Sequence, residues 1–167
     1  LKAQVNPHFL FNTLNNLYAL ILKGSDKSAE AVLKLADIMK YILAEGSQDK
    51  VPLEKELAML RNYADLESLR ATDATVTLQV GGALNGQLIT PLLLLPFVEN
   101  AFKYGLHTVA GSGFVDIAAV VSGGELQFTV RNNNPPPSNK EAIQSLGIGI
   151  SNVQRRLEYL YPGNYTI

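Results

Sequence analysis

Apolar residues recur with two different periods along this chain, and the change falls near residue 70. Before that point, three stretches repeat apolar residues every three or four positions, which predicts helices. The first stretch ends at Gly24, the second ends by Gly46, and the third begins near Pro52. The apolar stripe of the first helix consists of Leu10, Leu14, Leu17 and Ile21. Because short connections between long helices favour antiparallel packing, residues 1–70 are predicted to form a helical module.

The period shortens to two after residue 74, which is typical of strands. Strands are predicted around residues 76–80, 115–121 and 126–130, and helices over about 91–105 and 148–161. Gly123 and Gly124 predict a hairpin turn between the last two strands. The predicted fold class is therefore α+β. A helical module over residues 1–70 is followed by a domain over residues 74–167, in which helices cover one face of a largely antiparallel sheet.

Composition and charge narrow the possible functions. The 167 residues suffice for one domain or two small ones. A net charge of −1 provides no basic field for nucleic acid, and the absence of cysteine excludes disulfides, thiolate metal sites and cysteine nucleophiles. The longest apolar stretch, Leu88 to Phe102, is broken by prolines and polar residues and does not reach the length of a membrane span. Because the chain opens within a predicted helix and ends in a strand-like stretch, we expect it to be a piece of a longer protein.

The first candidate site is His8, with Asn12 one helical turn later. Imidazole is nucleophilic at neutral pH and is able to carry a phosphoryl group. His8 falls on the helix face opposite the leucine stripe, and Asn12 beside it is suited to hold a water or a phosphoryl oxygen. The ordinary alternative is a solvated histidine on a polar face. The flanking Phe9 and Phe11 argue against it, because we expect them to offer apolar surface to a partner.

The second candidate site lies in the predicted helix 91–105, where Glu99, Asn100 and Lys103 interrupt an apolar run. Polar groups at such positions are costly unless they line a cavity or meet a ligand. The amide oxygen of Asn100 suits a hard cation such as Mg²⁺, and Lys103 suits phosphate. From these residues alone, a surface ion pair between Glu99 and Lys103 explains the pattern equally well.

The third candidate site is formed by Gly147 and Gly149, directly before the last predicted helix. Glycines at this position let backbone N–H groups approach a phosphate at the positive end of the helix. By itself a Gly-x-Gly pair is weak evidence, since many helices begin with glycine for steric reasons.

In this order and spacing, the three sites together resemble one protein family. The segment LKAQVNPHFLFNTLNNL (residues 1–17) is similar to the phosphoacceptor segment of the LytS/YehU-type sensor histidine kinases. The segment PLLLLPFVENAFKYG (residues 91–105) resembles the N box of that family's GHKL-type ATP-binding domain. The segment GIGISNVQRRLEYLYP (residues 147–162) resembles its glycine-rich G2 box and the helix that follows. The resemblance covers nearly the whole chain.

The resemblance implies roles for the residues of the second and third sites. Asn100 would ligate the Mg²⁺ that bridges the phosphates of ATP. Lys103 would lie near those phosphates, and Tyr104 would pack beside the adenine. Gly147 and Gly149 would allow the ATP lid to fold over the phosphates.

The sequence also departs from the family pattern. Glu99 is characteristic of the N box, but Tyr104 stands where the family often has histidine. Most GHKL proteins carry an aspartate after the central hairpin that accepts the adenine amino group. Here Asn132 holds that position, and its carbonyl oxygen is able to accept the bond without a charge. Phe9 stands where many other sensor kinases have an acid next to the histidine.

The activity implied by the resemblance is that of the cytoplasmic catalytic core of a two-component sensor kinase. ATP would phosphorylate His8, which would pass the phosphoryl group to an aspartate of a response regulator, commonly one with a LytTR-type DNA-binding domain. The helical module would pair with a second copy into a four-helix bundle, and the longer protein would be anchored in a bacterial inner membrane. Asn12 is predicted to orient a water for dephosphorylation of the regulator.

Two alternatives remain open at this point. One is a non-catalytic pseudokinase that dimerises and signals by conformation, which the change to Asn132 suggests. The other is a GHKL ATPase that hydrolyses ATP. Pro96 stands where those enzymes carry a catalytic glutamate, which argues against it.

Overall fold

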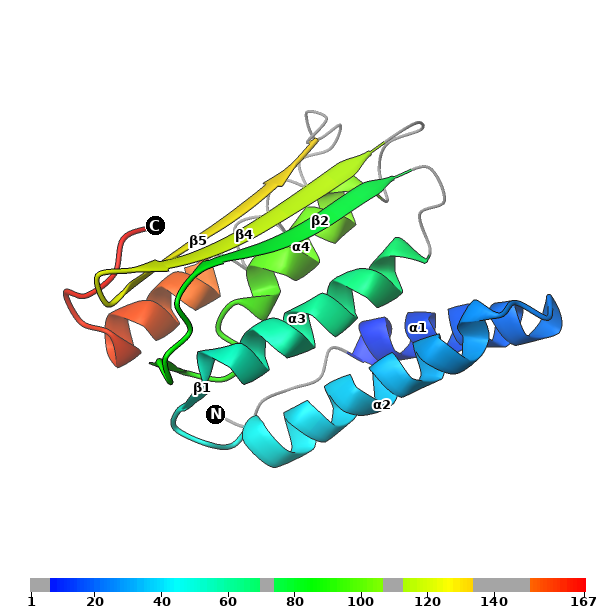
Figure 1. Cartoon of the computed structure of the whole chain (residues 1–167), viewed down its shortest axis with the longest axis horizontal. Coiled ribbons are helices and arrows are strands. Elements are labelled where there is room, and N and C mark those ends of the chain that lie inside the picture. The colour runs from blue at the N-terminus through cyan, green and yellow to red at the C-terminus, as the bar shows by residue number, and fades with distance from the viewer. Residues whose placement is uncertain (1–6, 70–73, 107–112, 134–150) are drawn as a thin grey trace. The chain divides into compact units, whose positions relative to one another are not determined.

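The computed structural model describes residues 7–69, 74–106, 113–133 and 151–167 (Figure 1). The chain forms two compact units: Leu1–Thr72 with Ala83–Leu92, and Asp73–Gly82 with Leu93–Ile167. Helices and strands are both present, so the predicted α+β class is confirmed. The segment Ala83–Leu92, which the sequence assigned to the second domain, lies in the first unit.

In the described part of the first unit there are three helices: α1 (Pro7–Leu22), α2 (Lys27–Glu45) and α3 (Leu53–Ser68). They match the three predicted helices, and α3 begins directly after Pro52. The connection from α1 to α2 uses Gly24 at φ +62°, a left-handed conformation that glycine adopts without a steric penalty. Figure 1 shows α1 and α2 as a helical hairpin, with α3 running back along α2.

The side of α1 that packs against its own chain shares Leu17 with the predicted stripe, whereas Leu14 and Ile21 of that stripe are exposed. Phe9, Thr13 and Leu17 are buried, and Phe9 stacks on Tyr63 of α3 with ring centroids 4.6 Å apart. The expectation that Phe9 offers exposed apolar surface was therefore wrong. Apolar residues lie on several sides of α1, so the periodicity alone could not identify the side that faces α3.

A pair of two-residue strands joins the segment Ala83–Leu92 to the helical part of the first unit. β1 (Val51–Pro52) pairs antiparallel with β3 (Leu88–Ile89), and the Leu53 N–H donates to the Gln87 carbonyl at 2.8 Å. These bonds hold the returning segment Ala83–Leu92 beside the start of α3. Strands of two residues show no alternation, so the sequence could not predict this pair.

The second unit contains a three-stranded sheet with the order β2-β4-β5. β4 (Phe114–Ser122) and β5 (Glu125–Asn132) form the predicted hairpin, with Gly123 and Gly124 at φ +59° and +84°. β2 (Thr75–Gly82) pairs with β4 in parallel. The prediction of a largely antiparallel sheet was wrong for this pair, because α4 lies between the two strands in the chain and a helical crossover returns the chain in the same direction.

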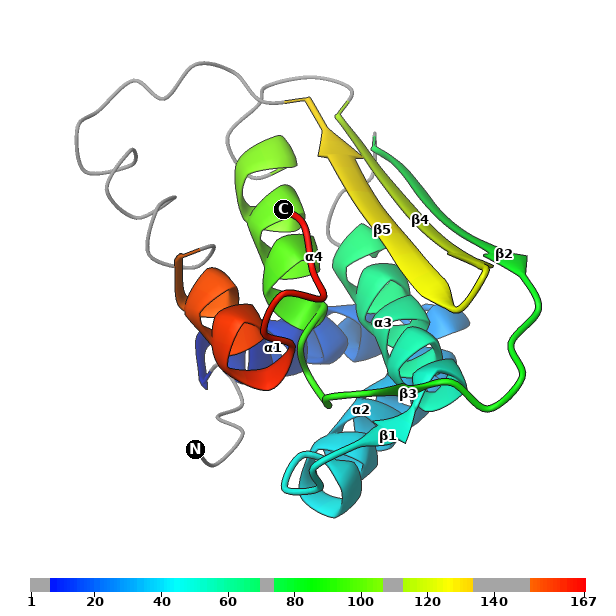
Figure 2. The same cartoon turned by 90° about the vertical axis from the view of Figure 1, so that its left-hand side faces the viewer.

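Two helices cover one face of this sheet, as predicted. α4 (Leu95–Gly105) and the helix over residues 151–160 lie on the same side (Figure 2). Phe97 of α4 meets Phe128 of β5 with ring centroids 6.3 Å apart. α4 begins four residues later than predicted, because Leu92 adopts φ +57° and turns the chain before the helix starts. Among the described residues, no helix is long and apolar enough to cross a membrane.

Candidate functional site

The helix α4 carries most of the residues of the second candidate site. Pro96 lies in its first turn, where a missing N–H is tolerated, and Val98, Ala101 and Phe102 are buried. These apolar contacts fix the rotation of the helix. Asn100 and Tyr104 are four residues apart and therefore share one side of α4. Tyr104 is buried, whereas Lys103 is exposed.

Asn100 has an unusual polar environment. Its Nδ2 is out of contact with solvent and has no hydrogen-bond partner within the described part of the chain. A buried polar group without a partner destabilises a fold by about 1–3 kcal/mol, so each such group requires an explanation, such as strain, a catalytic role, or a water or ion that binds there. A half-turn of the side-chain amide exchanges Nδ2 and Oδ1, which would bring a hard oxygen ligand into the same position. Asn100 therefore fits the role of a Mg²⁺ ligand.

The C-terminal end of α4 lies against the end of β5. A Cβ atom placed on Gly105 would be 2.8 Å from the Cβ of Asn132, so only glycine permits this approach. The Asn132 side chain is half-buried, and its Nδ2 lies 3.4 Å from the Asn133 carbonyl oxygen. Asn133 Oδ1 accepts the Phe114 N–H at 2.7 Å and so joins the ends of β4 and β5. Asn132 and α4 are thus brought together in one unit.

Lys103 and Tyr104 lie close to one another. The Lys103 Nζ is 4.9 Å from the centre of the Tyr104 ring. An ammonium group at this distance is attracted by the face of the ring. The exposed cation beside the buried aromatic ring is compatible with a phosphate and a base at neighbouring positions.

The acceptor segment lies in the other unit. His8 is in the first turn of α1, and the described side chains begin at Phe9. Asn12 follows one turn later, is half-buried and makes polar interactions. Gly147 and Gly149 lie outside the described residues, so the third candidate site stays a prediction.

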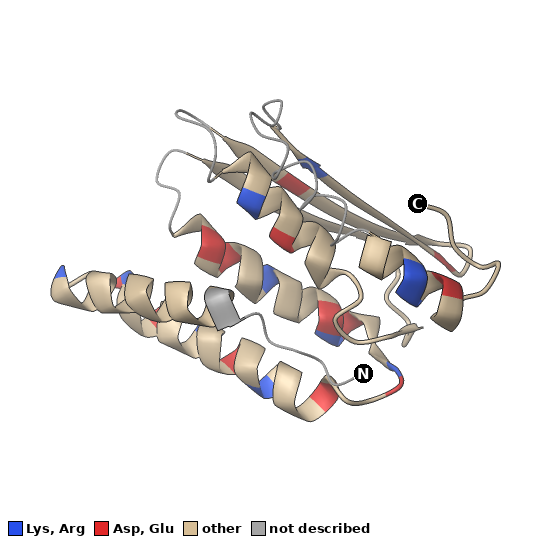
Figure 3. Cartoon of the chain, turned by 180° about the vertical axis from the view of Figure 1, so that it is seen from behind, with Lys and Arg blue, Asp and Glu red and all other residues tan. Residues whose placement is uncertain are grey.

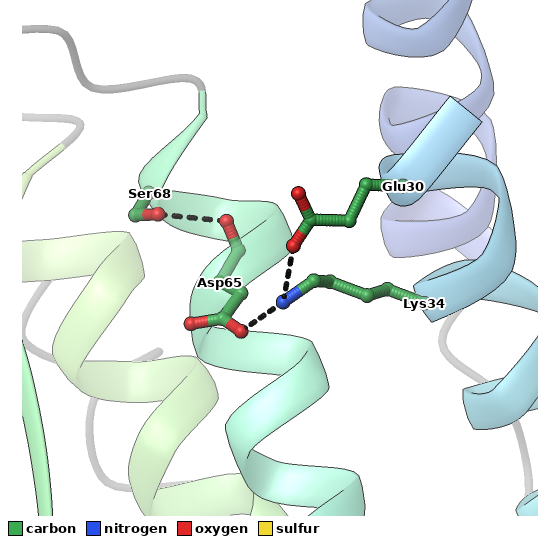
Figure 4. Close-up of polar contacts among 4 residues, drawn as sticks. All are labelled: Glu30, Lys34, Asp65 and Ser68. Carbon is green, nitrogen blue, oxygen red and sulfur yellow. Dashed lines mark hydrogen bonds and ion pairs between the residues drawn. The ribbon is translucent and has the colours of Figure 1, made fainter. Parts of the chain in front are cut away.

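An ion-pair cluster joins two helices of the first unit. Lys34 of α2 contacts Asp65 of α3 and the Oε1 of Glu30 at 3.1 Å, and the Asp65 carbonyl accepts the Ser68 hydroxyl at 2.7 Å (Figure 4). The hydrogen bond to Asp65 raises the pKa of Lys34 above its ordinary 10.5, although partial burial opposes the shift; Glu30 adds to the rise. Elsewhere, Figure 3 shows charged residues distributed along several helices rather than collected on one element.

The sequence reasoning missed a buried acid in the first unit. Glu56, in the first turn of α3, has no exposed surface and binds Tyr41 of α2. A signal was present, because Glu56 lies three residues after Leu53 and four before Leu60, on the apolar side of the helix. An acid within an apolar stripe indicates a buried polar contact.

Known proteins similar to this chain point to one family. The histidine kinase family matches residues 1–75. The sensor protein LytS of Staphylococcus haemolyticus is 31% identical over 96% of this chain and 30% of its own length. The sensor histidine kinase BtsS of Escherichia coli is 31% identical over 100% of the chain and 29% of its own length. The sensor histidine kinase/phosphatase LytS of Staphylococcus aureus is 28% identical over 88% of the chain and 25% of its own length.

The chain thus spans about a third or less of these curated relatives. The part similar to LytS of Staphylococcus haemolyticus and to BtsS includes both His8 of α1 and the α4 segment. Two distant motifs, the histidine of α1 and the Asn100 motif of α4, occur in one alignable region. On this similarity, residues 1–75 belong to the histidine kinase family, and the chain as a whole is similar to LytS-type sensor histidine kinases.

Proposed function

We propose that this chain is the phosphotransfer and nucleotide-binding core of a two-component sensor kinase. The first unit carries the acceptor His8, and the second unit binds ATP along α4 as a GHKL-type domain. His8 then passes its phosphoryl group to an aspartate of a response regulator. The observation that supports this proposal best is the Nδ2 of Asn100, on the helix that resembles the N box, which is out of contact with solvent and has no hydrogen-bond partner among the described residues.

The residues of the second unit suit a nucleotide in three ways. Asn100 would hold Mg²⁺, which would offset charge on the nucleotide phosphates when bound. Lys103 is exposed and able to approach a phosphate, while Tyr104 and Asn132 would define the adenine side. Phosphoryl transfer depends mainly on positioning and electrostatics, so a cation ligand, donors and a fixed acceptor are the parts it requires.

The acceptor has to be a nucleophile that bears a phosphoryl group reversibly. Neutral imidazole meets this requirement at physiological pH. His8 lies in the first turn of α1. Asn12, one turn later, would orient the water that removes phosphate from the regulator, and the name of the Staphylococcus aureus relative includes a phosphatase activity.

The further parts of the proposal concern partners. A response regulator with a LytTR-type output would receive the phosphoryl group. A second copy would pair through the exposed side of α1, where Leu14 and Ile21 are 47% and 57% exposed. The longer protein would be anchored in a bacterial inner membrane, which leaves this part cytoplasmic.

Labelling with γ-³²P ATP tests the proposal. We expect incorporation that is lost in acid, because phosphohistidine is acid-labile, and that disappears in His8→Gln with nucleotide affinity unchanged. Asn100→Ala should weaken Mg²⁺-dependent nucleotide binding by about 1–3 kcal/mol. Thr129→Ala, an exposed residue on β5, serves as the matched control. Nucleotide binding without labelling would favour the pseudokinase, and equal loss of both in His8→Gln would give His8 a structural role.

A further inference from the structure

A buried carboxylate collects donors from two different parts of the first unit. Glu56 of α3 is 0% exposed. Its Oε2 accepts the Tyr41 hydroxyl of α2 at 2.5 Å and the Leu92 backbone N–H at 2.9 Å. Bonds to an ionised acceptor are stronger than those between neutral groups, and breaking one leaves a buried charge with fewer partners. One oxygen atom thus links α2, α3 and the end of the returning segment.

Leu92 is the residue at which the chain leaves the first unit, since Leu93 belongs to the second. Its φ of +57° is unfavourable for a residue with a Cβ atom, and its side chain is buried. Such a conformation persists only where the surroundings hold it. The Glu56 carboxylate is one of the groups that hold it, because it binds the Leu92 N–H directly.

Other bonds of the segment Ala83–Leu92 reach residues directly before α3 or its first residue. β3 pairs with β1, the Leu53 N–H binds the Gln87 carbonyl, and the Lys50 Nζ lies 3.3 Å from the Thr90 hydroxyl. Tyr41, through Glu56, brings α2 into this arrangement. Tyr41 of α2 is therefore linked through Glu56 to Leu92, which lies three residues before the first residue of α4.

We propose that Tyr41 and Glu56 form a latch that fixes the backbone at Leu92, three residues before α4 begins. Both are positioning residues for phosphoryl transfer, because α4 carries Asn100 and α2 belongs to the helical unit that carries His8. A change in the α2–α3 pair would reach the nucleotide helix through this latch. The inference rests on the function proposed above.

A permanent latch requires that the Tyr41 hydroxyl stays protonated at neutral pH. Burial raises the pKa of Tyr41, and the charge of Glu56 raises it further. Its hydroxyl therefore remains a donor throughout the neutral range. Glu54 provides a matched comparison, because it is also an acid in the first turn of α3 but is exposed. Any favourable interaction of an acid with the helix dipole applies to both residues. The hydrogen bonds from Tyr41 and Leu92 are made to Glu56.

Two measurements on the same chain test the latch. In the first, amide hydrogen exchange is compared between the parent, Tyr41→Phe and Glu56→Gln, with Glu54→Gln and the exposed Tyr159→Phe as controls. We expect exchange over residues 88–98 to accelerate about tenfold in Glu56→Gln and less in Tyr41→Phe, with the protection of α2 unchanged. Unchanged exchange over residues 88–98 in both variants would overturn the latch. Tyr41→Phe keeps the measurement decisive if Glu56→Gln does not fold.

The second measurement is the rate of labelling from γ-³²P ATP at varied ATP. We expect kcat to fall about fivefold or more in Tyr41→Phe and Glu56→Gln while KM stays within about twofold, because the nucleotide residues lie in the other unit. Faster amide hydrogen exchange over residues 88–98 with an unchanged kcat would overturn the positioning role of Tyr41 and Glu56, and would leave the proposed kinase function intact. A parent chain that binds ATP but is never labelled would overturn the proposed function itself.

Discussion

Gly105→Ala tests whether the close approach of α4 and β5 shapes the proposed nucleotide site. The added Cβ would lie 2.8 Å from the Asn132 Cβ and 3.0 Å from its Nδ2. Carbon atoms in contact are normally about 3.5–4.0 Å apart, so helix and strand must separate by roughly 0.7 Å or more. The Asn132 Cβ is attached to the backbone of β5, so rotation of the side chain cannot relieve the contact.

The expected change in the free energy of unfolding is the difference between two opposing effects. Overpacking a close contact destabilises a fold by about 1–3 kcal/mol. Alanine is a better helix former than glycine by about 1 kcal/mol, and less than this at the end of a helix. We therefore expect Gly105→Ala to lower the free energy of unfolding by about 1 kcal/mol, and by up to about 2 kcal/mol if β5 is rigid. Displacement of Asn132 should also weaken nucleotide binding about tenfold, which corresponds to about 1.4 kcal/mol.

Urea unfolding followed by tyrosine fluorescence measures the first effect, and titration with ATP and Mg²⁺ measures the second. Gly81→Ala is the matched control, because its Cβ would lie 3.6 Å from a Val120 methyl group, an ordinary contact. It should change the stability by less than about 0.5 kcal/mol. If Gly105→Ala stabilises the protein or behaves like Gly81→Ala, the close approach does not constrain the site. If stability falls and affinity does not, Asn132 is not part of the nucleotide site.

Three further outcomes are expected. Asn12→Ala should retain labelling of His8 and lose most phosphatase activity toward the phosphorylated regulator, with the exposed Asn15→Ala as control; parallel loss of both activities would indicate misfolding. Leu14→Asp should shift the chain toward monomer in sedimentation, and an unaltered dimer would place the interface elsewhere. The raised pKa of Lys34 means that its contribution to stability is complete below pH 10.5 and is lost as pH rises through the higher value of the folded state. The difference in unfolding free energy between the parent and Lys34→Met should therefore shrink above pH 10.5, and a constant difference would contradict the ion pair.

The sequence predicted those features that depend on residues close together along the chain. The hairpin follows from Gly123 and Gly124, whose left-handed conformations match a two-residue turn. The end of α1 follows from Gly24 in the same way. The sharing of one side of α4 by Asn100 and Tyr104 follows from helical spacing alone.

Features that depend on contacts between residues far apart in the sequence could not be predicted from local patterns. The side of α1 that is buried depends on Tyr63, which is far along the chain but stacks on Phe9. The late start of α4 depends on the conformation of Leu92, which a buried carboxylate on another helix supports. The contact between Gly105 and Asn132 likewise joins a helix end to a strand end that no spacing rule connects.

The division of the chain into interleaved units has a consequence for how such proteins are cut and recombined. The polypeptide passes between the units after residues 72, 82 and 92, so neither unit is a continuous stretch. A piece that ends at residue 72 lacks the strand that pairs with Val51 and the N–H that binds Glu56. A piece that starts at residue 73 carries ten residues, Ala83–Leu92, whose partners have been removed. A chimera that joins the helices of one such protein to the second unit of another should therefore inherit Ala83–Leu92 from the parent that supplies the helices. During synthesis, likewise, the helical unit has to wait for β2 to be made before its last segment is available to complete it.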